Sequence, residues 1–356
     1  MASTISSHFH ALIMAGGKGE RFWPWSRENR PKQLLPLLGK KTMIEMTVDR
    51  LLPLIPKQQI WIVTNAKQAR QMSRHMPGFS KSNFVVEPVG RDSAGAVMLG
   101  CAMIAREDPQ AVMALLPADH LIPTVKTYLK ILHGAFEVAM RERVLVTIGI
   151  KPREPSSAYG YIERGEKTGN LRSTVSMFRV QRFLEKPDPQ TACELVKSER
   201  FYWNSGMFVW SARAIEDAFK QHSSVHAQGW KALQKNPRRY LAKGFSALPT
   251  ISIDYAVMEK ARNIRVVEGA FDWDDVGSWG ALYHHMPHDI CGNASQGNVV
   301  LEDSQGCLVL GGGKVIAALG IQDLVVIQTD DALLICRRDA AGRLKDLVKK
   351  LPPAMR

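Results

Sequence analysis

The sequence predicts an α/β protein built on a Rossmann-like sheet, with a small β-rich appendage at its C-terminal end. Between residues 9 and 150, short apolar runs alternate with amphipathic stretches, which is the rhythm of βαβ units. Runs such as 112–116 are apolar at every position, as expected of strands that helices cover on both faces. After about residue 290 the pattern changes to short apolar runs separated by Gly, Asp and Asn.

Strands and helices are expected to alternate through the first half of the chain. The expected strands cover residues 9–15, 59–65, 82–87, 111–117 and 144–150, and the expected helices cover residues 43–54, 66–75, 93–107 and 125–142. The alternation then loosens into hairpin-like strands at 158–163, 175–185 and 203–210 and helices at 188–198, 211–221 and 251–261.

These elements suggest two domains. The first covers residues 1–287, with halves at 9–150 and 151–287, and the second covers residues 288–356. The second is expected to be β-rich and to end in a basic helix near 339–350. Because no regular repeat can be counted in it, a β-helical arrangement is only one hypothesis for this domain.

The composition is that of an ordinary globular protein, with 45% hydrophobic and 23% charged residues among 356. No apolar run reaches the length of a membrane-spanning helix, and Met1–His10 lacks the features of a signal peptide. The cysteines are scattered without a C-x-x-C pair, which argues against a disulfide framework and a zinc knuckle. They are Cys101, Cys193, Cys291, Cys307 and Cys336. We therefore expect a cytoplasmic protein with reduced thiols and no membrane partner.

The formal net charge of +13 would attract polyanions, including nucleic acids and phosphorylated metabolites. Lys and Arg are spread along the chain, however, and no RNP-type or helix-turn-helix motif accompanies them. We therefore expect no nucleic-acid partner.

A glycine cluster, Gly16-Gly17-Lys18-Gly19, follows the first expected strand. Such clusters let backbone N–H groups approach an anion closely. The spacing fits neither the G-x-G-x-x-G dinucleotide fingerprint nor the G-x-x-x-x-G-K-[ST] P-loop. The cluster therefore predicts an anion-binding loop of another kind.

Residues 15–33 resemble the signature of the sugar-phosphate nucleotidyltransferases: paired glycines, then Gly19-x-Arg21, then Pro31-Lys32. The variant with Phe22-Trp23-Pro24-x-Ser26-Arg27 is similar to the mannose-1-phosphate guanylyltransferases in particular. In that family the loop wraps a nucleoside triphosphate, so the resemblance implies nucleotide contacts from Gly16, Gly17, Lys18, Gly19, Arg21 and Lys32. It also implies a mixed, GT-A-like sheet flanked by helices.

Two acidic segments are candidates for metal binding. Asp119 follows a buried strand in Leu116-Pro117-Ala118-Asp119-His120, where an Asp is either a ligand-binding residue or a turn former. The resemblance favours the first, because the family has a metal-binding aspartate in this run. The family's W-x-D-[VL]-G pattern selects Asp275 as the second ligand, while Asp274 stays a rival. Carboxylate and phosphate oxygens suit Mg²⁺, which is the expected cofactor.

Three further runs match family motifs for the sugar phosphate. Phe183-Leu184-Glu185-Lys186-Pro187 fits F-x-E-K-P, which implies that Glu185 binds sugar hydroxyls and Lys186 the sugar phosphate. By the same resemblance Asn204 reaches the sugar and Gly160 brings backbone close to it. The alternatives are structural: Glu185-Lys186-Pro187 as a plain turn, and Trp203 and Phe208 as core residues.

Glu87-Pro88-Val89-Gly90-Arg91 opens the segment that the family uses near the nucleotide base. Glu87 could accept hydrogen bonds from guanine N1–H and the N2 amine, and Arg91 is expected to bind the nucleotide. The segment departs from the family pattern at Asp92, Ser93 and Gly95, which leaves strict selection of guanine open.

His284, His285 and His288 lack the i, i+4 ligand spacing of a zinc helix, and Pro287 interrupts any helix, so we expect a surface turn. No G-x-S-x-G elbow occurs, which argues against a serine hydrolase.

The resemblance implies transfer of GMP from GTP to mannose 1-phosphate by direct displacement, with release of pyrophosphate. The alternatives are transfer to another sugar 1-phosphate, such as a heptose or glucose, use of another nucleotide, or a non-catalytic sugar-nucleotide sensor. Many relatives carry a further cupin isomerase domain, and because this chain ends at Arg356 we expect a single activity. A homodimer is left open.

Overall fold

A computed structural model describes residues 6–17, 19–171 and 175–355. The chain divides into two compact units. The first unit comprises Met1–Gly16, Val48–Ala118 and Ile122–Trp273, and the second comprises Gly17–Thr47, Asp119–Leu121 and Asp274–Arg356. The signature segment after the glycine cluster therefore belongs to the same compact unit as the C-terminal residues.

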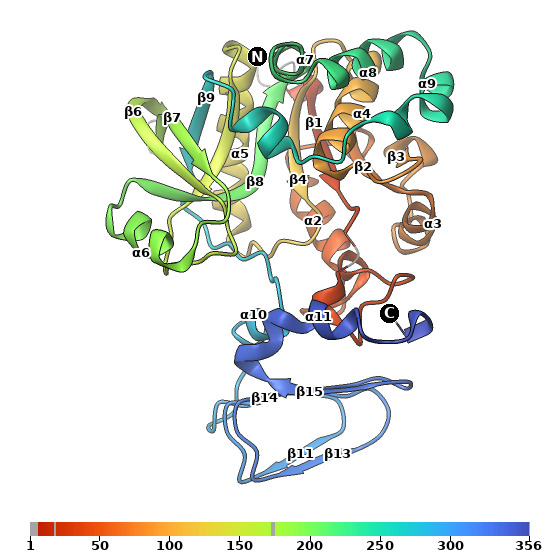
Figure 1. The fold of residues 1–356 in the computed structure, drawn as a ribbon, viewed down its shortest axis with the longest axis vertical. Helices are drawn as coiled ribbons and strands as arrows, with labels where there is room; N and C mark the ends of the chain where they lie inside the picture. The colour runs from red at the N-terminus through yellow and green to blue at the C-terminus, as the bar shows by residue number, and fades with distance from the viewer. Residues whose placement is uncertain (1–5, 18, 172–174, 356) are drawn as a thin grey trace. The chain divides into compact units, whose positions relative to one another are not determined.

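The first unit is built on a sheet with the strand order β3-β2-β1-β4-β8-β5-β9-β7-β6 (Figure 1). Its strands are β1 (Phe9–Met14), β2 (Ile60–Asn65), β3 (Phe84–Glu87), β4 (Val112–Pro117), β5 (Leu145–Ile150), β6 (Tyr161–Leu171), β7 (Val175–Leu184), β8 (Phe201–Ser211) and β9 (Ile264–Glu268). Strand β1 pairs in parallel with β2 and β4, whereas β8 runs antiparallel to both β4 and β5. The expected mixed sheet is thus confirmed.

Helices cover both faces of this sheet. The helices of the first unit are α3 (Ala66–His75), α4 (Asp92–Glu107), α5 (Val125–Arg141), α6 (Pro189–Lys197), α7 (Ala212–His222), α8 (Ser224–Lys235) and α9 (Pro237–Lys243). Strand residues alternate between faces, so Leu12 of β1 joins the core under α4, while Phe9 stacks on Phe136 of α5 with ring centroids 4.3 Å apart. Leu12 and Phe9 are fully buried, which explains why this strand is apolar throughout.

The second unit combines the signature segment with short strands. Helix α2 (Met43–Leu51) begins in this unit, which also contains η2 (Glu20–Phe22), η3 (Lys32–Leu34), α10 (Trp279–Tyr283), η8 (Arg338–Arg343), α11 (Leu344–Val348) and η9 (Pro353–Met355). The strands are β10 (Ala294–Gln296), β11 (Val299–Glu302), β12 (Leu308–Leu310), β13 (Ile316–Leu319), β14 (Leu324–Gln328) and β15 (Leu333–Arg337).

Strands β10, β12 and β14 stack in parallel, and β11 pairs in parallel with β13. Ala294 pairs with Leu308, and Leu308 pairs with Val325. The number of residues between one strand of the stack and the next therefore varies along the chain. This parallel stacking explains why no regular repeat could be counted in the sequence. Phe22, Leu35 and Trp279 share a buried cluster with the apolar residues of these strands.

The structure differs from the sequence predictions in three places. Residues 251–261 were expected to form a regular helix, but they contain a π-helical turn, Asp254–Met258, because residues 251 and 253 are bonded to Ala94 and Ser93 of α4. Strand β9 was not expected, since a five-residue run inserted between β5 and β7 has no periodic signal of its own. Helices α8 and α9 were also missed.

Candidate active site

The glycine cluster lies where β1 ends, and its first two members are exposed. A Cβ atom added to Gly16 or Gly17 would meet no other atom within 4 Å, so packing does not require glycine at either position. Lys18, also predicted to bind nucleotide, lies outside the described residues. Gly19 has φ of 67°, and an added Cβ would lie 2.5 Å from Cβ of Lys32. Gly19 therefore packs directly against the predicted site lysine.

Lys32 is 7% exposed, and its ammonium group lies among three oxygen atoms of the second unit. Nζ is 2.8 Å from Oδ2 of Asp119, and it donates to the Asp119 carbonyl at 3.2 Å and to the Asp275 carbonyl at 2.6 Å. A lysine ammonium has three N–H donors, so these acceptors match its capacity. We call Lys32, Asp119 and Asp275 the Lys32 cluster.

The carboxylate of Asp119 is kept charged by its surroundings. Burial acts to raise its pKa, but Lys32, His120 and Arg21 together outweigh that effect, so the pKa lies below its usual value. Its side chain is still 32% exposed. The exposed Arg21 is thus close enough to Asp119 to act on it electrostatically.

The second acidic segment is joined to the first by a β-bridge. Leu121 and Asp274 exchange backbone hydrogen bonds of 2.9 and 3.1 Å. Val276 has φ of 44°, which is strained for a β-branched residue, and its N–H donates to Oδ1 of Asp274 at 2.6 Å. The strained turn holds Asp274 and Asp275 in different roles: the Asp274 side chain ties the loop together, whereas the Asp275 carbonyl anchors Lys32.

His285 also binds Asp274, with its Nε2 2.8 Å from Oδ2. Burial acts to raise the pKa of Asp274, but His285, the Val276 N–H and Lys32 lower it below its usual value. The residues 284–288 do form a mostly exposed turn, as expected, yet His285 has a structural partner that the sequence did not reveal. The only cue in the sequence was the acidic residue Asp274, eleven residues before His285, and this spacing is not that of a known motif.

Among the described residues, no group of three or more His, Cys, Asp and Glu side chains could hold a metal ion by itself. The two carboxylates of the Lys32 cluster are hard oxygen donors, and a carboxylate that accepts from one lysine retains further lone pairs. The donor set therefore fits a divalent cation of the Mg²⁺ type whose coordination is completed by ligand oxygens and water.

The predicted sugar residues lie together in the first unit. The Asn204 N–H donates to the carbonyl of Gly160 at 2.7 Å, and a side chain at Gly160 would collide with the Glu185 carboxylate. Nζ of Lys186 lies 2.8 Å from Oε1 of Glu185. The Glu185 hydrogen bond, the largest effect, raises the pKa of Lys186, which is therefore charged at neutral pH.

Lys186 has φ of 44°, a left-handed conformation that costs a non-glycine residue about 1 kcal/mol or more. The segment Glu185-Lys186-Pro187 is therefore a strained bend, and it carries an exposed amine that is bonded to Glu185.

Asp254, which no sequence motif identified, belongs to the same group. Its Oδ1 accepts from Nδ2 of Asn204 at 2.9 Å. Burial raises the pKa of Asp254, and the Glu185 carboxylate raises it further. We call Gly160, Glu185, Lys186, Asn204 and Asp254 the Glu185 cluster.

The predicted base-binding residues also lie in the first unit. Burial raises the pKa of Glu87 to about 7, and its Oε1 has no hydrogen-bond partner among the described residues. Arg91 donates to the carbonyl of Ser246 and to Oγ1 of Thr250, so its guanidinium is partly used within the protein. Asp92 has φ of 58°, a conformation that Asn and Asp tolerate best.

The structural interpretation of the two aromatic residues is confirmed for Phe208, which is buried in the main core and stacks on Trp210. Trp203 is also buried, against Tyr159 and Trp273, but its indole N–H has no partner among the described residues.

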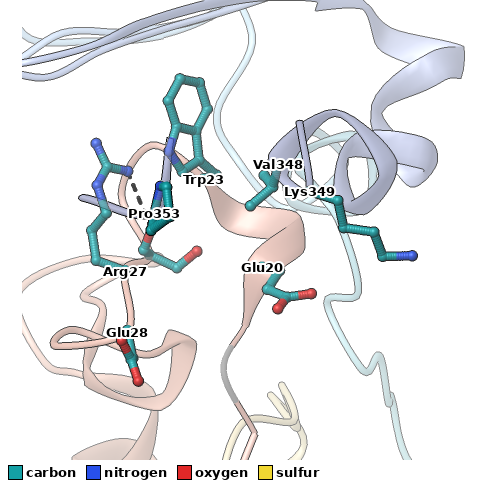
Figure 2. Close-up of a pocket in the computed structure, with 8 residues that line it drawn as sticks. Glu20, Trp23, Arg27, Glu28, Val348, Lys349 and Pro353 are labelled. Carbon is teal, nitrogen blue, oxygen red and sulfur yellow. Dashed lines mark hydrogen bonds between the residues drawn. The ribbon is translucent and has the colours of Figure 1, made fainter. Parts of the chain in front are cut away.

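A cavity of about 270 Å³ lies in the second unit, next to the signature segment. Figure 2 shows the residues that line it. Glu20, Trp23 and Arg27 line it together with Val348 and Lys349 from the C-terminal end. Arg21 and Lys32 are not among its described lining residues, so this cavity is separate from the Lys32 cluster.

Residues 10–290 match the family model described as "Nucleotidyl transferase", and residues 297–351 match the "MannoseP isomerase/GMP-like beta-helix domain". The second match supports the β-helical hypothesis for the parallel strands.

A mannose-1-phosphate guanylyltransferase of Sinorhizobium fredii is 36% identical, with 95% of this chain and 67% of that protein covered. The alginate biosynthesis protein AlgA of Pseudomonas aeruginosa is 35% identical, with 96% of this chain and 71% of that protein covered. A crystal structure from Thermus thermophilus, described as a mannose-1-phosphate geranyltransferase, has a TM-score of 0.88 at 36% identity and covers 96% of this chain and 99% of that one. The chain is therefore an enzyme of the nucleotidyl transferase family, within the group that includes the mannose-1-phosphate guanylyltransferases.

Proposed function

We propose that the protein transfers GMP from GTP to mannose 1-phosphate, producing GDP-mannose and pyrophosphate. The observation that carries this proposal is the pair of clusters. One places a buried lysine against the Asp119 carboxylate and the backbone carbonyls of Asp119 and Asp275, and the other places a strained lysine beside carboxylates and an amide. These residue types suit phosphate chemistry and recognition of a polyol, respectively.

The Lys32 cluster would serve the nucleotide phosphates. Asp119 and Asp275 would hold a divalent cation, proposed to be Mg²⁺, which when bound neutralises charge on the phosphoryl oxygens. Because Asp119 stays ionised at neutral pH, it needs no proton release before binding a cation. Arg21 is exposed near Asp119 and would bind the phosphates directly, as would backbone N–H groups of Gly16, Gly17, Lys18 and Gly19.

Lys32 is proposed to contribute in a different way from Arg21. Its three donors already have three acceptors, so contact with a phosphate would require release of at least one of them. Its first role would be to hold the two aspartate segments at a fixed distance. Its charge would still stabilise a nearby pyrophosphate through space.

The Glu185 cluster would serve the acceptor. Lys186, whose side chain is 63% exposed, would bind and orient the attacking phosphate, while Glu185, Asn204 and the Gly160 backbone would contact the sugar. In-line attack by that phosphate on the α-phosphorus forms the new P–O bond as the bond to pyrophosphate breaks, so no covalent enzyme intermediate is needed.

Glu87 is proposed to select guanine, whose N1–H and N2 amine are donors that a carboxylate can accept. Its buried Oε1, which lacks a partner among the described residues, supports this role. Arg91 would assist nearby.

We propose a cytoplasmic location, because all five cysteines are free, and no nucleic-acid partner. No helix of the described residues is long and apolar enough to cross a bilayer. We also propose a domain boundary near residue 287 and assembly into a homodimer.

The test is release of pyrophosphate by the purified chain with Mg²⁺, crossing GTP, ATP, UTP and dTTP against the 1-phosphates of mannose, glucose and a heptose. Release confined to GTP with mannose 1-phosphate would support the proposal. Preference for another pair would refute the assigned substrates, and no release with any pair would favour the sugar-nucleotide sensor.

A further inference from the structure

Asp254 stands at the start of an unusual turn. The N–H of Glu259 donates to the carbonyl of Asp254 at 2.9 Å, which is the i, i+5 pattern of a π-helix. Such turns are rare and occur frequently at functional sites. The turn is firmly held, because Ala256, Val257 and Met258 are buried in the main core of the first unit.

The partner of Asp254 has a fixed orientation. Oδ1 of Asn204 accepts from the N–H of Gly206 at 3.1 Å, so the amide nitrogen must be the atom that faces Asp254. Gly206 has φ of 68°, which turns the backbone so that this bond can form. Asp254 therefore acts as an acceptor towards Asn204, and the second N–H of the Asn204 amide has no partner among the described residues, so it can donate to a ligand.

The carboxylate of Asp254 is unfavourably placed for a purely structural group. Burial and the Glu185 carboxylate both disfavour its charged form, and the nearby amine of Lys186 is already bonded to Glu185. A buried carboxylate is stabilised by additional hydrogen-bond donors. A sugar hydroxyl is such a donor, and a carboxylate that accepts from one amide can accept from a hydroxyl as well.

We propose that Asp254 is a specificity-determining residue of the sugar pocket, where its carboxylate accepts a hydroxyl of the sugar while it holds the Asn204 amide for the neighbouring hydroxyl. This inference rests on the proposed function, because it assigns Asp254 to the same sugar 1-phosphate. It differs from a general role in folding, since it predicts sensitivity to one particular hydroxyl group.

The test is steady-state kinetics of the full chain with Asp254→Asn, using mannose 1-phosphate and its 2-, 3-, 4- and 6-deoxy analogues. We expect KM for mannose 1-phosphate to rise about 10-fold to 100-fold, as for loss of a hydrogen bond to a charged group, with KM for GTP unchanged. The wild type should have a higher KM for at least one deoxy analogue than for mannose 1-phosphate. In the variant, the KM values for that analogue and for mannose 1-phosphate should be equal. Glu259→Gln, which removes a carboxylate from the end of the same turn, is the matched control and should behave as wild type.

Unchanged KM for the sugar in Asp254→Asn, or the wild-type pattern of discrimination against every deoxy analogue, would overturn the inference. If Asp254→Asn does not fold, Asp254→Ser, which removes the carboxylate and leaves Asn204 unchanged, is tested against the same predictions. Wild-type turnover with a different sugar 1-phosphate would refute only the proposed substrate, and the series is then run on that sugar. No wild-type turnover with any pair would overturn both proposals.

Discussion

The Lys32 cluster and the Glu185 cluster treat their carboxylates in opposite ways. In the first, a buried ammonium lies among three oxygen atoms, and the pKa of Asp119 is lowered by neighbouring cations despite burial. In the second, burial and Glu185 raise the pKa of Asp254. The first arrangement keeps carboxylates ionised, as cation binding requires, whereas the second favours partners that donate hydrogen bonds without carrying charge.

The largest effect on kcat is expected from substitutions in the Lys32 cluster. Asp119→Asn and Asp275→Asn each remove a negative ligand, so we expect kcat to fall about 100-fold to 1,000-fold, a size typical of losing one electrostatic contact to the transition state. Pyrophosphate release at increasing Mg²⁺ measures this effect. Asp272→Asn is the matched control, because Asp272 belongs to the same acidic run but pairs with Arg153 at the surface. Wild-type turnover of Asp275→Asn at saturating Mg²⁺ would refute the ligand assignment.

The strained lysine of the Glu185 cluster should separate activity from stability. Glycine adopts the φ of 44° without strain, so Lys186→Gly should change the free energy of unfolding by no more than about 1 kcal/mol. Turnover with mannose 1-phosphate should nevertheless fall by about 100-fold, because the amine is lost. Thermal unfolding and pyrophosphate release measure the two quantities. Glu199→Gly, another left-handed position at the surface, should leave both nearly unchanged, and full activity of Lys186→Gly would contradict the assignment.

Loss of Lys32, the lysine of the Lys32 cluster, should reduce the free energy of unfolding. Lys32→Met leaves the Asp119 carboxylate and two carbonyls without their donor, which should cost about 1–3 kcal/mol at pH 7. Because the folded-state pKa of Asp119 is lowered, the stability from this pair is present above the ordinary value of 3.8 and is lost as the pH falls below it. Urea unfolding at pH 7 and pH 3 should show a smaller difference from wild type at pH 3. The account would be contradicted if Lys32→Met lost the same free energy of unfolding at both pH values. It would also be contradicted if that loss were no larger than the loss in the surface variant Lys40→Met.

The smallest effect concerns Glu87, which resembles Asp254 in its raised pKa. With a pKa of about 7, the carboxylate that would accept from guanine forms as the pH rises, so KM for GTP should fall by about threefold to tenfold between pH 6 and pH 8. Glu87→Gln should remove this part of the pH dependence, whereas the exposed Glu107→Gln should not. A wild-type pH profile in Glu87→Gln would exclude Glu87 from base recognition.

The sequence predicted much of the fold because β1 to β5 are apolar runs separated by amphipathic helices. It did not predict β9 or the turn at Asp254–Met258, since both depend on contacts with distant segments. The unequal steps of the β-helical strands have the same cause: spatial stacking of β10, β12 and β14 does not require equal spacing along the chain.

The candidate site shows a similar division. Motifs identified Lys32, Asp119 and Asp275, which the structure brings together in one unit. They did not identify Asp254, whose importance depends on a hydrogen bond to Asn204, fifty residues away in the chain. The role of His285 as partner of Asp274 was hidden for the same reason, because a single histidine in a turn carries no pairing signal.

Binding of GTP with Mg²⁺ by Asp119→Asn and Lys186→Gly, measured side by side in a calorimeter, tests the division between the two clusters most directly. We predict that Lys186→Gly binds the nucleotide with the Kd of wild type, whereas Asp119→Asn binds it at least about tenfold more weakly, as expected when a charged contact is removed. Equal loss of nucleotide binding in both variants, or none in Asp119→Asn, would contradict the assignment of nucleotide to one cluster and sugar to the other.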